Sequence, residues 1–168
     1  MNDRPVLLND DQVIDFVIRG YMVLEPDLPD GLNEQIFNHL EAIGDEVSGR
    51  HDAILEMVPK LNQVWDHPQV RGMLISLLDE DYTMNSHRHC HKNKPGTRSQ
   101  DWHQDSVNLR HHHVERLLGM YYPQDVTPDM GPTALVPGTH YRNAPTDRMA
   151  TYGNFRDQVV ATVKAGSV

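Results

Sequence analysis

The chain has 168 residues, of which 38% are hydrophobic, and a formal net charge of −9 at pH 7. A chain of this length is expected to form one domain with its own hydrophobic core. The acidic balance argues against nucleic acid as a partner, because phosphate contacts need clustered Lys and Arg. No apolar run approaches the roughly 18 residues of a membrane span, and the opening MNDRPVLLNDDQ is polar and acidic. We therefore expect a cytoplasmic protein with neither a membrane span nor a secretory signal.

Charge is unevenly distributed along the chain. Residues 1–80 carry 5 Lys and Arg against 16 Asp and Glu, whereas residues 81–168 carry 10 against 8. Seven of the eleven histidines fall between residues 87 and 113. The second half is therefore the expected place for a metal or an anion. The single cysteine, Cys90, excludes an internal disulfide framework.

The first predicted element is a helix. Asn9 is its expected N-cap, followed by acidic residues in the first turn and by apolar residues at helical spacing. Gly20 ends the pattern. The next stretch, YMVLE at residues 21–25, reads as a short strand.

More amphipathic helices are expected before residue 80. One places on a single face Leu32, Ile36, Leu40 and Ile43. Another begins near Pro68 and has a buried stripe made of Val70, Met73, Leu74, Leu77 and Leu78. Residues 49–66 fit either a helix broken at Pro59 or a partly irregular segment.

After residue 80 the pattern changes to strands and turns. In YTMNSHRHCH the residues alternate, which places His87, His89 and His91 on one side and Cys90 on the other. KNKPGTRSQ is a predicted loop, and strands are expected in VERLLGMYY, TALV and QVVATVKAGSV. Helices followed by short strands predict an α+β protein with a mainly β core, arranged as an antiparallel sheet or barrel.

The end of the sequence reads as an interrupted sheet. AGSV is a turn that launches a strand, and this leaves neighbouring strands with an open edge. We expect either a fragment or a domain completed by something else, such as a second copy in a homodimer formed through that edge.

The segment DWHQDSV contains the first chemical signal, His103 and Asp105. In extended backbone, residues i and i+2 project to the same face about 6.5 to 7 Å apart. Imidazole nitrogen and carboxylate oxygen are the donors of a non-haem Fe(II) facial triad, which needs a second His from elsewhere. The plainer interpretation is two polar residues in a solvated turn.

Three motifs in order extend this signal: LNDDQVIDFVIRGYMVLEPDL, WHQD and GPTALVPGTH. Through them the chain resembles the phytanoyl-CoA dioxygenase family of Fe(II)- and 2-oxoglutarate-dependent oxygenases, over essentially all 168 residues. The resemblance implies a single cupin-like domain, a double-stranded β-helix or jelly-roll with helices packed outside it. Residues 1–80 would be the helical part and residues 81–168 the first strands, with the jelly-roll incomplete at the C-terminus.

The resemblance also implies a site and a reaction. His103 and Asp105 would bind Fe(II), which 2-oxoglutarate would chelate, and an unactivated C–H bond of a small molecule would be hydroxylated with release of succinate and CO2. The family's second metal His, and the Arg that pairs with 2-oxoglutarate, follow the AGS-type turn, so the third ligand is not expected in this chain. His140 stands in a turn where the family already has another His, which makes it a poor replacement, and the 87–91 histidines could replace it only in a rearranged fold.

Other residues receive roles from their position in the family pattern. The substrate or cosubstrate pocket would be lined by His89, His91, Lys94, Tyr121 and Thr133, and the site would be braced by Gln104 and His140. Plainer roles are an outer sheet face for the histidines, an exposed loop for Lys94 and core packing for Tyr121. Trp102 and Cys90 are expected to pack, and the triplet of His111, His112 and His113 to be a surface site for adventitious metal.

Two other classes of function stay open. One is a non-catalytic binding module that keeps part of the barrel and dimerises through its open edge. The other is a Zn-dependent cupin-like hydrolase that uses the same two ligands and needs neither O2 nor 2-oxoglutarate.

Overall fold

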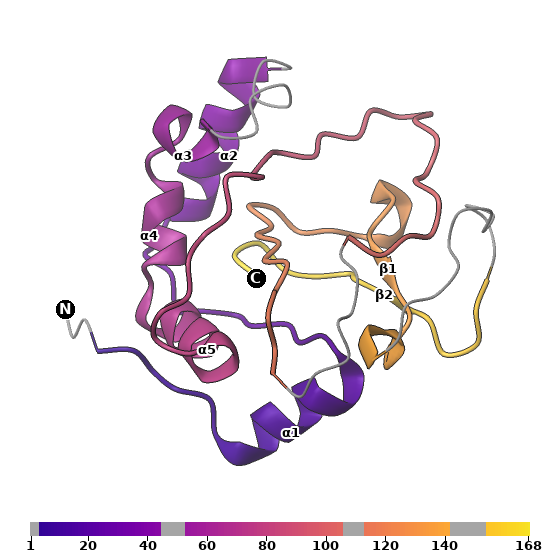
Figure 1. The fold of residues 1–168 in the computed structure, drawn as a ribbon. Coiled ribbons are helices and arrows are strands. Elements are labelled where there is room, and N and C mark those ends of the chain that lie inside the picture. Colours follow the sequence, from indigo (N-terminus) through magenta and orange to yellow (C-terminus); the bar gives the residue numbers. More distant parts are fainter. Residues whose placement is uncertain (1–3, 45–52, 106–112, 142–153) are drawn as a thin grey trace.

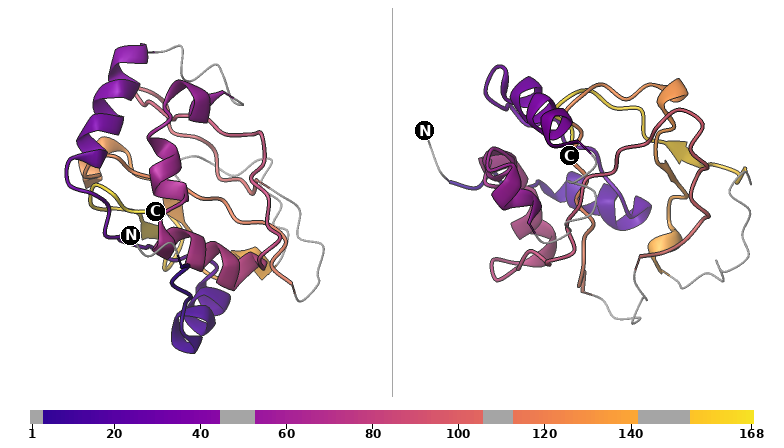
Figure 2. Two further views of the ribbon diagram at one scale, coloured as in Figure 1. Left: turned by 90° about the vertical axis from the view of Figure 1, so that its left-hand side faces the viewer. Right: turned by 90° about the horizontal axis from the view of Figure 1, so that it is seen from above.

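Helices gather on one side of the molecule, and extended segments with a short sheet lie on the other. The computed structural model describes residues 4–44, 53–105, 113–141 and 154–168. Figure 1 shows α2, α3, α4 and α5 along one flank, α1 below them, and the β1–β2 pair across the molecule. The view from above in Figure 2 repeats this division between helices and irregular chain.

The predicted first helix is confirmed as α1, Asp10–Arg19. Asn9 and Gln12 form a capping box, in which each side chain accepts a hydrogen bond from the other residue's backbone N–H. Gly20 ends the helix with φ of 77°, a left-handed conformation that favours glycine. Asp15 and Arg19 form an exposed ion pair one turn apart.

The remaining helices match the predicted pattern. They are α2 (Leu32–Ile43), α3 (Ile54–Met57), α4 (Leu61–Trp65) and α5 (Pro68–Leu78). Pro59 separates α3 from α4, which confirms the broken helix and excludes the irregular alternative for the described part of residues 49–66. Pro68 occupies the first position of α5, where its missing N–H costs no helical hydrogen bond.

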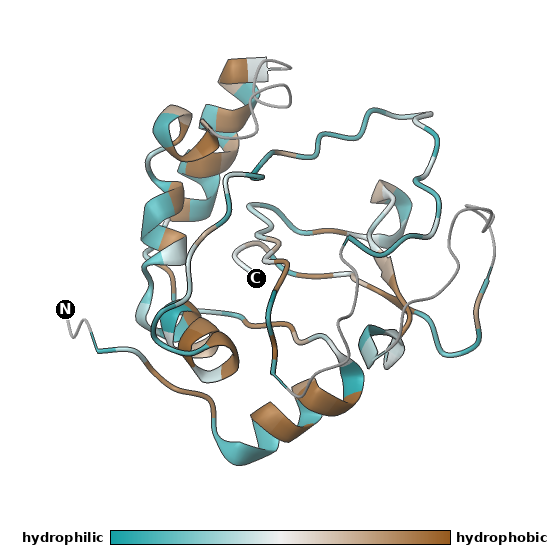
Figure 3. Cartoon of the chain, in the orientation of Figure 1, coloured by the Kyte–Doolittle hydropathy of each residue, from teal (hydrophilic) through white to brown (hydrophobic). Residues whose placement is uncertain are grey.

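The hydrophobic core is formed by the helical region. The buried hydrophobic residues of the described chain all lie between Phe16 and Leu77. One cluster joins α2 to α3 and α4, and a second joins α1 to α5. Trp65 and Val168 pack against both clusters. Figure 3 shows the hydrophobic colour concentrated on the helices, whereas the chain that follows α5 is mostly polar.

The sheet in the described residues is short. Strand β1, Ala134–Leu135, pairs antiparallel with β2, Val159–Val160, in the register Ala134 to Val160 and Leu135 to Val159. The turns η2 (Pro128–Met130) and η3 (Thr139–Tyr141) flank β1. Val126 and Val163 form an isolated antiparallel bridge that continues the pairing. The strands predicted in TALV and QVVATVKAGSV are thus confirmed in shortened form.

Backbone pairing also reaches residues far apart in sequence. Leu24 and Val168 exchange two N–H···O bonds of 2.9 Å, and the Tyr122 N–H donates to the Ser167 carbonyl at 3.0 Å. The last residues therefore lie between the segment after α1 and the segment before η2. We predicted that this segment would begin a strand with an open edge. In the structure its backbone is hydrogen-bonded to neighbours on both sides.

The expected mainly β core and double-stranded β-helix are not confirmed. In the described residues, the segments 21–25, 82–91 and 114–122 run without assigned strands, although Leu24 and Tyr122 pair with residues 166–168. The physical reason is that alternation in a sequence predicts extended backbone, whereas a strand also needs a neighbouring segment in register to pair with. None of the helices in the described residues has the length and apolarity to cross a bilayer.

Replacing Ile36 by Ala tests whether the helical core dominates stability. Ile36 is fully buried in α2, so the substitution should cost about 2 to 5 kcal/mol through lost burial and a residual cavity. Ile14→Ala on α1 removes the same atoms from a side chain that is 55% exposed and should cost about 0.5 kcal/mol or less. Urea unfolding followed by circular dichroism measures both, and equal losses would contradict a core centred on α2.

Asp125 gives a pH-dependent contact. Its carboxylate accepts the Ala165 N–H at 2.9 Å and pairs with Lys164 at 3.2 Å. The Ala165 hydrogen bond, followed by the Lys164 one, lowers the pKa of Asp125. A carboxyl whose folded-state pKa is lowered contributes stability above its unfolded-state value of about 3.9, and loses it as the pH falls through the folded-state value.

We therefore expect the Ala165 amide to lose hydrogen-exchange protection on going from about pH 6 to about pH 3. Protection factors from NMR measure this, with the Val163 amide, which donates to the Val126 carbonyl, as the internal reference. Asp125→Asn should weaken Ala165 protection at neutral pH and remove its pH dependence. Unchanged protection in that variant would contradict the assignment.

Candidate functional site

His103 and Asp105 meet in an irregular segment. The His103 Nε2 and Asp105 Oδ1 atoms are 3.3 Å apart, and both side chains are about half-exposed. Two donors that bind one ion at about 2.1 Å, in neighbouring positions of its coordination shell, lie about 3 Å from each other. The observed separation therefore fits a shared ion, and the mixed nitrogen and oxygen donors suit Fe(II).

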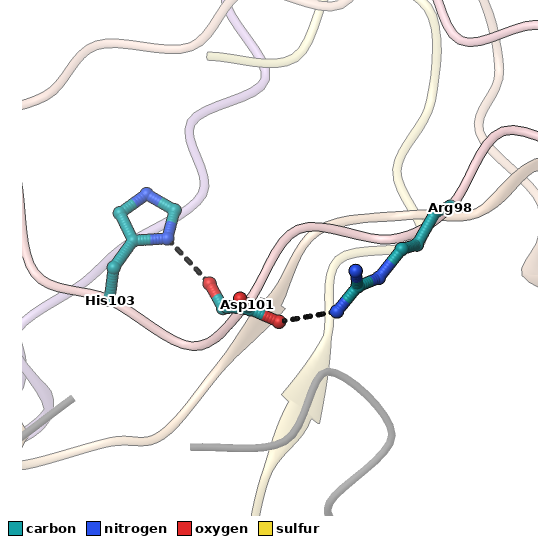
Figure 4. Close-up of polar contacts among 3 residues, drawn as sticks. All are labelled: Arg98, Asp101 and His103. Carbon is teal, nitrogen blue, oxygen red and sulfur yellow. Dashed lines mark hydrogen bonds and ion pairs between the residues drawn. The ribbon is translucent and has the colours of Figure 1, made fainter. Parts of the chain in front are cut away.

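A backbone hydrogen bond selects the tautomer of His103. Its Nδ1 lies 2.7 Å from the Asp101 carbonyl oxygen, which can only accept, so Nδ1 carries the proton. In this tautomer Nε2, the nitrogen nearer Asp105, is the one that could bind a metal ion. Arg98 holds the side chain of Asp101 at 3.3 Å, and Figure 4 shows this chain of contacts from Arg98 through Asp101 to His103.

The donor set is incomplete in the described part of the chain. Among residues 4–44, 53–105, 113–141 and 154–168, no three His, Cys, Asp or Glu side chains come together as a metal site. His103 and Asp105 are thus a candidate pair of donors. A facial triad needs one more protein ligand, which the sequence pattern also did not provide.

Neighbouring side chains connect this segment to the C-terminal part of the chain. The Gln104 amide donates to the Thr139 carbonyl at 3.2 Å, which ties the residue between the two candidate ligands to η3. The Trp102 ring contacts Phe155 edge to face, with centroids 5.0 Å apart. The packing contact of Trp102 matches the role expected from the sequence, whereas bracing of the site by Gln104 stays a prediction.

His140 lies against α1. Its Nε2 is 3.0 Å from the Val17 carbonyl, which also accepts the Tyr141 hydroxyl, and the Gly138 N–H donates to the Arg19 carbonyl at 2.8 Å. The turn at 138–141 therefore satisfies carbonyls of the last helical turn, which have no partner inside the helix. The structure shows a capping contact for His140, and its neighbour Thr139 accepts the hydrogen bond from Gln104.

The histidines at 87, 89 and 91 share one side of an extended segment, as the alternation predicted. Successive rings contact one another edge to face, with centroids 4.9 Å apart for His87 and His89 and 4.3 Å apart for His89 and His91. On the other side, Cys90 packs against the α2 cluster, where burial raises the pKa of its thiol. That environment disfavours a thiolate, so the expectation of a packing role for Cys90 fits the structure.

The other predicted pocket residues lie in separate surroundings. The Tyr121 hydroxyl donates to Asn33 Oδ1 of α2 at 2.6 Å, and burial raises the pKa of this phenol. Thr133 accepts the Ala161 N–H with its carbonyl at 2.8 Å, next to the β1–β2 pair. Lys94 precedes an exposed turn closed by a 3.0 Å bond from the Thr97 N–H to the Lys94 carbonyl. The triplet at residues 111–113 lies largely outside the described residues.

Sequence reasoning missed Asp101 and Asn33. Asp101 positions His103 through its backbone carbonyl. Every residue has such a carbonyl, so the residue type at this position does not reveal the contact. Asn33 lies 88 residues before its partner Tyr121, so no local pattern could connect them. The DWHQD spacing was the only local signal for Asp101.

Comparisons with known proteins agree with the motif resemblance. The family model described as phytanoyl-CoA dioxygenase (PhyH) matches residues 32–168, which is most of the chain. No curated protein matched the chain. No solved structure matched it either.

Gly20→Ala tests how the 138–141 turn docks on α1. An added Cβ would lie 2.0 Å from His140 Nδ1, and the φ of 77° itself strains an L-residue by about 1 to 2 kcal/mol. Gly131→Ala is the matched control, since Gly131 also follows a helix, η2, is left-handed with φ of 69° and ψ of 53°, and has no described atom within 4 Å of an added Cβ. Thermal unfolding should show a larger loss for Gly20→Ala; equal losses would mean that His140 moves aside freely.

Proposed function

The chain belongs to the phytanoyl-CoA dioxygenase family, and from that premise we propose that it is an Fe(II)- and 2-oxoglutarate-dependent oxygenase acting on a small molecule. When bound, Fe(II) with 2-oxoglutarate and O2 would supply the chemistry that hydroxylates an unactivated C–H bond and releases succinate and CO2. The observation that carries the proposal is the 3.3 Å approach of His103 Nε2 to Asp105 Oδ1.

The chain's own residues prepare this pair for a cation. The Asp101 carbonyl accepts a hydrogen bond from His103 Nδ1–H, and in this tautomer the lone pair lies on Nε2. Asp105 contributes the negative charge that offsets part of the ion's charge.

We assign the pocket residues as the family pattern does. His89, His91 and Lys94 offer polar atoms to 2-oxoglutarate or substrate oxygens, and Thr133 and Tyr121 border the same ligand. Support for Tyr121 is weaker than for the histidines, because its hydroxyl is already bonded to Asn33. Gln104 would brace the pair through Thr139.

The fold that we propose is the cupin-like double-stranded β-helix of the family. Its support is the pairing of β1 with β2, the Val126–Val163 bridge, and the exchange of bonds between Leu24 and Val168. These pairings bring four separate stretches of chain into contact, and β-helix strands also pair with non-neighbours in sequence.

An anaerobic titration with Fe(II) and 2-oxoglutarate tests the function directly. Chelation of the metal by the keto acid produces a weak visible charge-transfer band, which we expect in the native chain. Asp105→Ala should abolish the band, because it removes the anionic donor of the pair. Asp30→Asn, on an exposed turn, is the matched control and should retain it.

A second candidate function is a non-catalytic binding module. It is favoured by the absence of a third donor in the described part of the chain. This alternative predicts no band in a chain shown by circular dichroism to be folded, and self-association through a sheet edge, measured by light scattering. A band that is lost in Asp105→Ala would exclude it.

A further inference from the structure

The segment 87–92 presents two different sides. Cys90 packs against the α2 cluster, and the Lys92 ammonium pairs with Glu41 of α2 at 2.8 Å. Successive residues of extended chain point to opposite sides. Anchoring of residues 90 and 92 on α2 therefore holds the three histidine rings together on the side away from α2, where they contact one another.

Two of these rings converge at their nitrogen atoms. His89 Nε2 and His91 Nε2 are 2.8 Å apart. Two neutral rings can stay this close when the N–H of one ring donates to the lone pair of the other, whereas two facing lone pairs repel each other. A cation removes that repulsion, and imidazole nitrogens bound to one ion at about 2.0 to 2.1 Å in neighbouring positions lie about 3 Å apart.

The donor chemistry differs from that of His103 and Asp105. Two imidazoles without a carboxylate suit the borderline ions Cu(II), Zn(II) and Ni(II), and Cu(II) binds such nitrogen sites most tightly. The pair is accessible, since His91 is exposed and His89 is partly exposed. By alternation the cations Arg88 and Lys92 belong to the opposite side of the segment, and Glu41 neutralises Lys92, which reduces their repulsion of a bound ion.

We propose that His89 and His91 form a second metal site, which takes a borderline divalent cation through two imidazole nitrogens, with water in its other positions. His87 packs edge-on against His89 and orients its ring. The proposal does not depend on oxygenase activity. If the chain is an oxygenase, the same rings border its substrate or cosubstrate, and a cation held there excludes that ligand from the two nitrogens.

Titration of the metal-free full-length chain with Cu(II), followed by electron paramagnetic resonance, tests the site. We expect the most tightly bound Cu(II) to give a spectrum with nitrogen couplings from imidazole. Loss of a group that merely supports a metal ligand weakens affinity about 10- to 100-fold, so the double substitution H89Q/H91Q should weaken this site at least as much. Circular dichroism of each metal-free variant checks folding, and H91Q alone, at an exposed position, serves if the double variant unfolds.

Three controls separate this site from the other histidines. H103Q removes the proposed iron ligand and should leave the imidazole signal in place. H39Q, at an exposed position of α2, should do the same. H111Q/H112Q/H113Q removes the histidine triplet and should also retain it. Loss of the signal in the triplet variant, or an unchanged affinity in H89Q/H91Q, would overturn the proposal.

Discussion

Residues 166–168 make the contact on which much of the remaining structure depends. Val168 exchanges two backbone hydrogen bonds with Leu24, and Ser167 accepts one from Tyr122. The Val168 side chain also packs against both hydrophobic clusters, one built on α2 and the other on α1 and α5. One short segment thus joins the helical half to the segment that leads into β1. A buried backbone needs partners for its polar groups, and here they come from Leu24, 144 positions before Val168, and from Tyr122, 45 positions before Ser167.

This junction also explains why Tyr121 is tied to the helical half. Once Tyr122 is paired with Ser167, the neighbouring tyrosine reaches α2 and donates to Asn33. Gly166 lies beside the same Asn33, with so little room that an added Cβ would be 2.8 Å from its side-chain nitrogen. The helical layer and the paired segments are therefore held together by specific polar contacts as well as by apolar packing.

The candidate metal pair depends on backbone geometry as much as on residue type. His103 could present either ring nitrogen, and the Asp101 carbonyl decides which one carries the proton. The row at 87–91 shows the same principle, because contacts of Cys90 and Lys92 with α2 decide which side the three rings occupy. At His103 a backbone carbonyl, and at residues 87–91 the alternation of side chains along the segment, set the direction in which a histidine nitrogen points.

The sequence by itself determined the helices and the positions of the candidate ligands. Asn9, Gly20 and Pro68 act within one or two turns of their own position, so capping and helix boundaries could be read locally, and the 103–105 spacing placed two donors on one side. The tertiary structure alone decided which extended segments pair, that the buried core lies in the helical region, and that His140 caps α1. The physical reason is distance along the chain. A paired strand, a hydrophobic core and a long-range helix cap each need a contacting residue far away in sequence, and local residue patterns do not identify it.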